Sequence, residues 1–403
     1  MLRRRSEVAK QKVLMVLTRP LNKNPQSGRE KINLFIHQSL EDAATVEVVE
    51  FHHLFRLKHI PGFISAGFKF LTGLVSGKRL PLQALLFSDK REINRIVQIA
   101  RHFKPDSIFV ESERSFLLFK ALSAELPTTR IVCDFDDLLS RRMREWASHN
   151  NSVSLGYVAR FIPTAVQKLI NGPLAAWLCR YEAATLSQLE EACFNDADQV
   201  ILLSSAEEAI LMPRLPKHQK AKLHVIPPAC NIRKTLKLPN QPLRFVFIGS
   251  DSLLQNRLTI DYLVKQWQTL KPVTPLVIYG KMNRQYPAVA NLSFAGFADT
   301  LDDVYTPNSM LLAPAFVKGG IKTKILESLE YGTMVVGNQI SWEGISPIDA
   351  SEQRKLALQN AIVSPHDHLL PFFDESQAAI MHLQATSTTD QIKQRWLNCM
   401  LPN

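Results

Sequence analysis

The stretch that decides the fold is LLAPAFVKGGIKTKILESLEYG, residues 311–332, in which an apolar strand runs into a Gly-Gly turn and then into a helix. Two glycines let a ligand approach the backbone closely, and the first turn of a helix offers unpaired N–H groups at the positive end of its dipole. The helix also carries two lysines and, one turn further on, a carboxylate that can accept hydrogen bonds from sugar hydroxyls. This pattern suits a phosphate with a sugar attached; a strand-turn-helix with a solvated basic edge is the alternative.

Length and composition predict a soluble protein of two domains. A chain of 403 residues exceeds what one core usually holds, and 46% hydrophobic with 21% charged residues is typical of globular proteins. The longest apolar runs stay well short of the roughly 20 residues that cross a bilayer. The N-terminal MLRRRSEVAKQKVLMVLT has an apolar run of only a strand's length, which indicates a first strand rather than a signal peptide.

Cysteine usage and charge narrow the compartment and the partners. The five cysteines are scattered without a CxxC pair, so neither a disulfide framework nor a zinc site is indicated, and a reducing compartment fits best. The formal net charge of +11 predicts attraction to phosphate-rich partners. Nucleotides, anionic lipids and nucleic acid all qualify, but no recognition-helix cluster or aromatic-basic platform supports nucleic acid.

Short β-branched runs alternate with amphipathic helical stretches along the whole chain, which is typical of parallel α/β domains. In the first half the predicted strands are 13–18, 46–51, 107–110, 130–134, 199–203 and 222–226, and the predicted helices include 30–40, 90–103 and 174–194. The segment 227–242, PPACNIRKTLKLPNQP, has four prolines and predicts a linker.

After this linker the alternation restarts. The predicted strands are 244–248, 276–279, 292–294, 310–313 and 334–336, and the predicted helices are 256–270 and 321–331, with a terminal helix at 388–401. We therefore predict two doubly wound Rossmann-like domains, 12–232 and 243–385, and a terminal helix within 386–403 that packs back towards the first domain. Ligands of such sheets bind outside the carboxyl ends of the strands, so the two domains should face each other across a cleft.

A series of short motifs in the second half, in this order, resembles the C-terminal domain of the group 1 retaining glycosyltransferases. The motifs are FIGS at 247–250, Asn256, AGF at 295–297, AP at 313–314, GGIKTKILES at 319–328, EG at 343–344 and NAIVSPHD at 360–367. The first half is similar more loosely, through SGR at 27–29, the aspartates of CDFDD at 133–137 and SSAE at 204–207.

This resemblance implies the GT-B fold, with a nucleotide-sugar donor held mainly by the C-terminal domain, an acceptor held by the N-terminal domain, and no need for a cofactor or metal ion. By position, Glu327 matches the glutamate that binds the nucleotide ribose, and Lys322 and Lys324 with the Gly-Gly turn face the diphosphate. Gly28 and Arg29 match the loop that closes over the donor phosphates. The expected donor-binding residues are Gly28, Arg29, Gly249, Ser250, Asn256, Arg257, Gly319, Gly320, Ile321 and Glu327.

The chain departs from the family pattern in three places. Gly319 stands where many relatives have a glutamate that contacts the donor sugar. Ser250 and Asp251 stand where many have an arginine and a lysine, which gives the two lysines of GGIKTK more weight. Glu111 and Asp136 stand where relatives often place a histidine beside the reacting sugar.

The four expected catalytic residues are Lys324, Lys322, Asp136 and Glu111, each with a structural alternative. On a regular helix the two lysines diverge, so one of them at most faces the phosphates squarely; we favour Lys324, which shares a helix face with Glu327. For both lysines and for Glu327 an exposed surface position is the alternative. Asp136 and Glu111 end strands, where ligand sites concentrate, but both could equally cap the helix that follows.

The segment 54–86 combines several phenylalanines and leucines with five basic residues. It predicts an interfacial helix on an anionic membrane surface, and a core-facing helix with a solvated basic edge is equally compatible.

Together these features predict a cytoplasmic glycosyltransferase, peripheral on the inner face of the plasma membrane, that transfers a sugar to a glycan or lipid-linked acceptor with retention. Surface polysaccharide or lipopolysaccharide assembly is the setting that the resemblance implies. The alternatives are a sugar-nucleotide epimerase or phosphorylase on the same plan, and a non-catalytic protein of this fold that binds lipid or partner enzymes.

Overall fold

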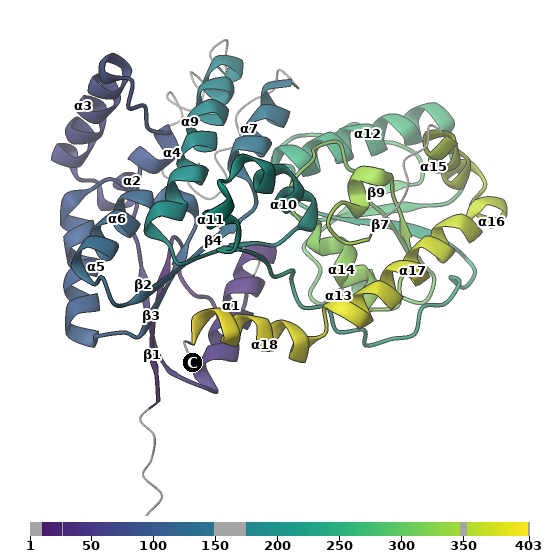
Figure 1. The fold of residues 1–403 in the computed structure, drawn as a ribbon. Helices are drawn as coiled ribbons and strands as arrows, with labels where there is room; N and C mark the ends of the chain where they lie inside the picture. Colours follow the sequence, from purple (N-terminus) through teal and green to yellow (C-terminus); the bar gives the residue numbers. More distant parts are fainter. Residues whose placement is uncertain (1–9, 26, 149–174, 347–352, 402–403) are drawn as a thin grey trace, which may run out of the picture.

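The computed structural model describes residues 10–25, 27–148, 175–346 and 353–401 of the chain. Two lobes lie side by side in Figure 1, and each is built around one parallel sheet. Part of the predicted N-terminal domain, residues 149–174, lies outside the described residues, as do residues 1–9.

The N-terminal lobe contains a six-stranded sheet in the order β2-β1-β3-β4-β5-β6, with every pairing parallel. Its strands are β1 Lys12–Leu17, β2 Thr45–Glu50, β3 Ser107–Glu111, β4 Arg130–Asp136, β5 Gln199–Leu202 and β6 Leu223–Val225. The chain order reverses between β1 and β3, which makes the carboxyl ends of these two strands the expected ligand-binding edge.

Helices cover both faces of this sheet because its strands are apolar on both sides. Alternate β1 residues enter different cores: Leu14 and Val16 face one cluster, and Val13, Met15 and Leu17 face the other. The helices of the lobe are α1 Gly28–Glu41, α2 Leu54–Leu57, α3 Ile60–Ser76, α4 Leu82–Leu85, α5 Lys90–Phe103, α6 Phe116–Glu125, α7 Leu139–Ser148, α9 Ala175–Asp196, α10 Ser205–Leu211 and α11 Lys217–Lys220. Figure 1 shows α3, α7 and α9 together at the upper end of the lobe.

The C-terminal lobe contains a five-stranded parallel sheet in the order β11-β10-β7-β8-β9, and its chain order reverses between β7 and β10. Its strands are β7 Arg244–Ile248, β8 Leu276–Tyr279, β9 Leu292–Gly296, β10 Ser309–Leu312 and β11 Val335–Val336. Its helices are α12 Leu254–Leu270, α13 Leu301–Val304, α14 Thr323–Glu330, α15 Gln353–Val363, α16 Pro365–His368 and α17 Leu370–Thr386. A single apolar cluster around Phe245, Trp267 and Trp342 forms the core of this lobe.

The last helix, α18 Thr389–Met400, leaves the C-terminal lobe and lies against the N-terminal lobe beside α1 (Figure 1). Trp396 packs edge-on against Phe109 of β3 at 5.9 Å between ring centroids, and Arg130 Nη1 donates to the Cys399 carbonyl at 3.1 Å. The two lobes are therefore joined by this return as well as by the segment between β6 and β7.

The predicted α/β architecture is confirmed, and the strands and helices predicted from the α/β alternation are present with their ends within two residues of the expected positions. The segment 54–86, expected to form one interfacial helix, instead forms the three helices α2, α3 and α4. The agreement reflects the strong periodicity of the sequence. A strand buried on both faces requires a continuous apolar run, and the helices between such strands require apolar residues at helical spacing.

Candidate active site

A pocket of about 550 Å³ is lined by residues of both lobes. The C-terminal lobe contributes the loops after β7 and β10 and the first turn of α14, and the N-terminal lobe contributes Ser27, Gly28, Lys31, Arg142 and Trp146. The loops after β7 and β10 lie at the point where the strand order of the C-terminal sheet reverses, so the topology itself places the pocket there.

The Gly-Gly turn before α14 lies in the left-handed region, with φ of 94° at Gly319 and 66° at Gly320, which explains the two glycines. Its backbone N–H groups are already bound by carboxylates: Gly319 N donates to Glu343 Oε2 at 2.9 Å, and Gly320 N donates to Glu207 Oε1 at 3.2 Å. The part of this segment left for an anion is therefore the start of α14: Ile325 N already donates to the Lys322 carbonyl at 2.8 Å, whereas the N–H groups of Thr323 and Lys324 come before the first intrahelical acceptor.

Lys324 lies in the pocket wall with neutral partners. Its Nζ donates to Asn256 Oδ1 at 2.7 Å and lies 4.1 Å from the centroid of the Phe247 ring. Burial lowers the pKa of Lys324 to about 7; the Glu327 carboxylate offsets this only in part, and the charge of Lys322 lowers the pKa further. An anion arriving beside this nitrogen would supply the missing compensation.

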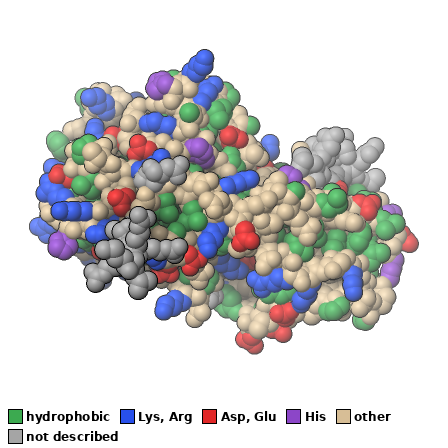
Figure 2. Space-filling model, turned by 60° about the horizontal axis from the view of Figure 1, so that its bottom comes forward, with side chains coloured by type: hydrophobic (Ala, Val, Ile, Leu, Met, Phe, Trp, Pro, Cys, Tyr) green, Lys and Arg blue, Asp and Glu red, His purple; other side chains and the backbone are tan. Residues whose placement is uncertain are grey.

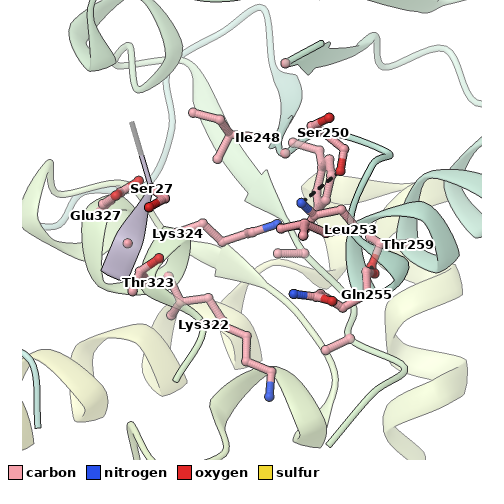
Figure 3. A pocket seen from close by; sticks show the side chains of 18 of the residues that line it. Ser27, Ile248, Ser250, Leu253, Gln255, Thr259, Lys322, Thr323, Lys324 and Glu327 are labelled. Carbon is pink, nitrogen blue, oxygen red and sulfur yellow. Dashed lines mark hydrogen bonds between the residues drawn. The ribbon is translucent and has the colours of Figure 1, made fainter. Parts of the chain in front are cut away.

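Lys322 points away from Lys324, as Figure 3 shows. Its Nζ donates to the carbonyl oxygens of Gly319 and Gly320, each at 3.1 Å, and lies 3.7 Å from Glu343 Oε2. The predicted divergence of the two lysines is therefore present, with Lys322 supporting the shape of the turn and Lys324 extending along the pocket wall.

Glu327, the expected ribose ligand, lines the pocket and pairs with a lysine of the other lobe. Lys31 Nζ of α1 lies 2.5 Å from Glu327 Oε1, and the side chain of Lys31 is 42% exposed while that of Glu327 is 16% exposed. The carboxylate thus has a flexible partner that solvent can replace.

Gly28, the first residue of α1, lies directly against the first residue of α14. A Cβ atom at Gly28 would stand 2.6 Å from Thr323 Oγ1, a separation that only glycine allows. Two helix N-termini therefore meet at one side of the pocket, and their dipoles both favour a negative charge there.

Arg29 follows Gly28 but turns into the N-terminal lobe, where it is 7% exposed. Its Nη2 lies 2.7 Å from Asp134 Oδ2, its Nε lies 3.1 Å from Glu111 Oε1, and its Nη1 lies 3.4 Å from Asp136 Oδ1. Three carboxylates thus surround this guanidinium, and Arg29 is not among the residues that line the pocket.

Glu111 and Asp136 belong to the same ionic cluster and do not line the pocket either. Burial opposes ionisation of Glu111, but the charges of Arg19 and Arg29 and hydrogen bonds from Thr18 outweigh it and lower its pKa to about 2. The cluster stands at the carboxyl ends of β3 and β4, next to the point between β1 and β3 where the chain order reverses, but its carboxylates bind Arg29 rather than facing the pocket.

The remaining expected donor-binding residues fall into two groups. Gly249, Ser250, Asn256 and Ile321 line the pocket, whereas Arg257 does not. Asn256 links the loop after β7 to α14, because its Nδ2 donates to the Ser250 carbonyl at 3.1 Å while its Oδ1 accepts from Lys324 Nζ.

Sequence reasoning missed the contribution of α7. Arg142 and Trp146 line the pocket from the N-terminal lobe, and Arg142 forms an ion pair with Asp137. The available signal was position: the basic helix follows directly on CDFDD, which ends a strand at the ligand-binding edge.

The two carboxylates that bind the Gly-Gly turn, Glu207 and Glu343, belong to the sequence motifs SSAE and EG quoted above, but neither carboxylate was assigned a role from sequence. Glu207 of α10 also accepts from Leu138 N at 3.2 Å, and burial together with the charge of Asp137 raises its pKa to about 8. Glu343 pairs with Arg141 of α7. Both therefore tie the turn of the C-terminal lobe to the N-terminal lobe.

Within the described residues, no group of three or more His, Cys, Asp or Glu side chains is arranged to hold a metal ion. Among the described helices, none combines the length and the apolar character that crossing a bilayer requires. On the face shown in Figure 2, Lys and Arg side chains are spread over both lobes and interspersed with acidic and apolar ones.

The C-terminal lobe matches a known protein family. Residues 242–367 match the family model described as "Glycosyl transferases group 1", a range that runs from the end of the linker to α16 and includes the pocket residues of this lobe. A search of curated protein sequences finds no significant match.

Solved structures with the same two-lobed fold span nearly the whole chain. Sucrose-phosphate synthase from Thermosynechococcus elongatus matches with a TM-score of 0.60 at 14% identity, covering 96% of this chain and 97% of its own. Anabaena HepE in complex with UDP and glucose matches with a TM-score of 0.59 at 12% identity, covering 96% and 98%. The lipopolysaccharide outer core galactosyltransferase WaaB matches with a TM-score of 0.56 at 11% identity, covering 96% and 99%. At these identities the likeness shows the fold, which is GT-B as expected.

Proposed function

We propose that this chain, which has the GT-B fold and a C-terminal lobe that matches the group 1 glycosyltransferases, binds a nucleoside diphosphate sugar in its pocket and transfers the sugar to a glycan or lipid-linked acceptor. Retention of configuration, independence from metal and a cytoplasmic setting in surface polysaccharide or lipopolysaccharide assembly are parts of this proposal. No nucleic acid is involved in it.

The observation that carries the proposal is Lys324, a buried ammonium group with neutral partners beside the N-terminus of α14. A diphosphate placed there would meet the lysine, the first turn of α14 and the first turn of α1. Each of these groups favours a negative charge, and none of them has to break an existing ion pair before the diphosphate binds.

The proposed reaction breaks the bond between the anomeric carbon and the diphosphate oxygen and forms a bond from that carbon to the acceptor hydroxyl oxygen. The acceptor proton passes to the departing diphosphate, so no protein nucleophile is required. Negative charge grows on the diphosphate as the bond breaks, and a preorganised ammonium group beside it lowers the barrier. Lys324 is therefore the central catalytic residue of this proposal.

Glu327 is proposed to bind the ribose hydroxyls once the donor displaces Lys31. The exchange costs little because Lys31 is substantially exposed and can return to water. Both hydroxyls would donate to a carboxylate that the helix already holds at the pocket.

Uracil is the base that we propose first. Anabaena HepE has a similar fold and was solved with UDP and glucose, and WaaB is named a lipopolysaccharide galactosyltransferase, which agrees with a hexosyl donor and a surface glycan.

A thermal-shift panel of UDP, GDP, ADP and CMP, each with and without magnesium, tests the donor site. We expect one diphosphate to stabilise the protein in the absence of magnesium and its hexose derivative to be consumed when acceptor is added. Absence of a shift with all four would overturn the donor assignment. Conversion of a nucleotide sugar to its epimer without acceptor would overturn transfer.

A further inference from the structure

Helix α3, Ile60–Ser76, presents a continuous apolar face to solvent. Ile60 is 71% exposed, Ile64 69%, Phe68 68%, Leu71 61% and Val75 91%. These positions recur every three or four residues and so lie on one side of the helix. We call these five residues the α3 stripe; a row of this length exceeds the scattered apolar groups of an ordinary protein surface.

The opposite side of α3 attaches the helix to the N-terminal lobe. Phe63 packs edge-on against Phe55 at 5.1 Å, and Phe70 packs edge-on against Tyr181 of α9 at 5.6 Å. Lys69 also faces inward, with its Nζ donating to the Ser88 carbonyl at 3.1 Å. The stripe is therefore the outward side of a helix that has already buried its other face.

Basic residues predominate around the stripe, although Glu50 pairs with Arg56 and Asp89 pairs with His59 at the start of α3. Residues 51–88 contain no aspartate or glutamate, and their basic residues include Arg56, Lys58, Lys78 and Arg79, all exposed at the two ends of α3. A nearby exposed aromatic adds to the surface: Trp177, 52% exposed, stacks on Tyr181 at 5.7 Å. Basic groups at the ends of an apolar helix, with tryptophan at the margin, complement an anionic lipid surface.

We propose that the α3 stripe docks this protein on an anionic lipid bilayer, with the helix lying in the interface plane. The stripe enters the boundary between headgroups and acyl chains, while Lys58, Lys78 and Arg79 contact lipid phosphates. A protein partner would require complementary acidic groups on a matching groove, whereas a bilayer supplies both the apolar layer and the anionic charge along the whole helix. The length of α3, about 25 Å at 1.5 Å per residue, suits such a contact.

The position of α3 gives the docking a consequence for the reaction, and this step rests on the proposed function. The helix follows the carboxyl end of β2, and in a parallel sheet all carboxyl ends lie at the same edge. That edge also carries the loop after β1 and helix α7 after β4, and both contribute residues to the pocket shared with the C-terminal lobe. A docked protein would thus hold its acceptor side close to the lipid surface, as a lipid-linked acceptor requires.

Vesicle flotation of the full chain tests the docking. We expect binding to vesicles of phosphatidylcholine mixed with phosphatidylglycerol, and much weaker binding to phosphatidylcholine alone. Phe68→Ser/Leu71→Ser should reduce binding about tenfold or more, because two exposed apolar side chains no longer enter the membrane. Lys78→Glu/Arg79→Glu should reduce binding and remove its dependence on salt.

The matched control is Val273→Ser/Met381→Ser, which removes two apolar side chains, 86% and 65% exposed, from the C-terminal lobe. It should bind vesicles like the wild type. Phe68→Trp gives a second measurement. The fluorescence of the new tryptophan should shift to the blue on vesicles. Brominated acyl chains in the membrane should quench it, whereas a water-soluble brominated compound should not.

Equal flotation of the stripe variant and the wild type would overturn the proposal, as would a wild type that does not float. A lipid-free dimer that becomes monomeric in Phe68→Ser/Leu71→Ser would assign the stripe to a second copy of the chain instead. The UDP thermal shift should be unchanged in the stripe variant. Flotation without any nucleotide shift would leave the docking standing and overturn the proposed donor site.

Discussion

Lys324 and Arg29 are two cations that the sequence assigns to the same diphosphate, and their surroundings are opposite. Lys324 in the C-terminal lobe has an amide oxygen and an aromatic ring as partners, while Arg29 in the N-terminal lobe is enclosed by three carboxylates. Burial lowers the pKa of Lys324 to about 7, whereas the carboxylates around Arg29 raise its pKa above the ordinary value despite burial.

This difference separates a binding cation from a structural one. A buried cation with neutral partners is incompletely compensated and gains from an arriving anion, whereas a cation among carboxylates is already compensated and holds its neighbours in place. The cations of the N-terminal wall of the cleft are thus used in internal ion pairs, whereas Lys324 in the C-terminal wall is available to bind the donor diphosphate.

The largest expected effect comes from breaking the ionic cluster. Arg29→Ala should lower the free energy of unfolding by about 3–5 kcal/mol, because it leaves buried carboxylates without their shared partner. Denaturant unfolding measures the loss, and Arg29→Lys should lose less because it keeps the charge.

The pH dependence of this loss is a further check. Because the pKa of Glu111 is lowered from 4.5 to about 2, this carboxylate stabilises the folded state fully above pH 4.5, and the stabilisation is lost as the pH falls through about 2. The difference in unfolding free energy between the wild type and Arg29→Ala should therefore become smaller between pH 4.5 and pH 2. A deficit that does not change with pH would contradict the ionic explanation.

Removing Lys324 should affect the reaction and spare the fold. Lys324→Ala is expected to reduce kcat/KM about 10²–10³-fold, the loss typical of one preorganised charge-stabilising donor. Steady-state transfer measures it, and unfolding should show no loss, since a desolvated ammonium group is removed. Lys265→Ala, at an exposed position of α12, is the matched control and should be silent.

The ribose contact should have the next largest effect. Glu327→Gln is expected to weaken UDP binding about ten- to a hundredfold, because hydrogen bonds from the ribose to a charged acceptor become bonds to a neutral one. Titration calorimetry measures this, and free phosphate or pyrophosphate should bind the variant as well as the wild type. Equal weakening of pyrophosphate would assign Glu327 to the phosphates instead.

The affinity for UDP should depend on pH through Lys324. The diphosphate stabilises the ammonium form, so the pKa of Lys324 rises on binding and protons are taken up above pH of about 7. The association constant is expected to fall about tenfold per pH unit above that value. Lys324→Arg stays charged and should remove the slope; a wild type with flat affinity up to pH 9 would contradict the low pKa.

The smallest expected effect concerns the ion pair between the lobes. Lys31→Ala frees Glu327 and should raise UDP affinity by a factor of about two to five, because an exposed pair is worth about 1 kcal/mol at most. A clear loss of affinity would show that Lys31 itself binds the donor.

Local periodicity predicted most of the fold, and motif order predicted the C-terminal wall of the pocket. Gly249, Ser250, Asn256, Lys324 and Glu327 line that wall because they lie in the loops after β7 and β10 or in the first turns of the helices that follow, so position in the chain determines position in space. The N-terminal wall was predicted less well. Gly28 lines the pocket, but Arg29, one residue later, turns the other way, and Arg142 and Trp146 came from a helix without a motif.

The sequence by itself determined the alternation of strands and helices, the Gly-Gly turn and the helix that carries Lys324 and Glu327, since each depends on residues close together in the chain. The tertiary structure alone decided which charges are available. Arg29 meets Glu111 across 82 positions and Lys31 meets Glu327 across 296, and such ion pairs depend on which strand ends the fold brings together. Whether a charged side chain serves binding or structure depends on the sum of its neighbours, which no local pattern encodes.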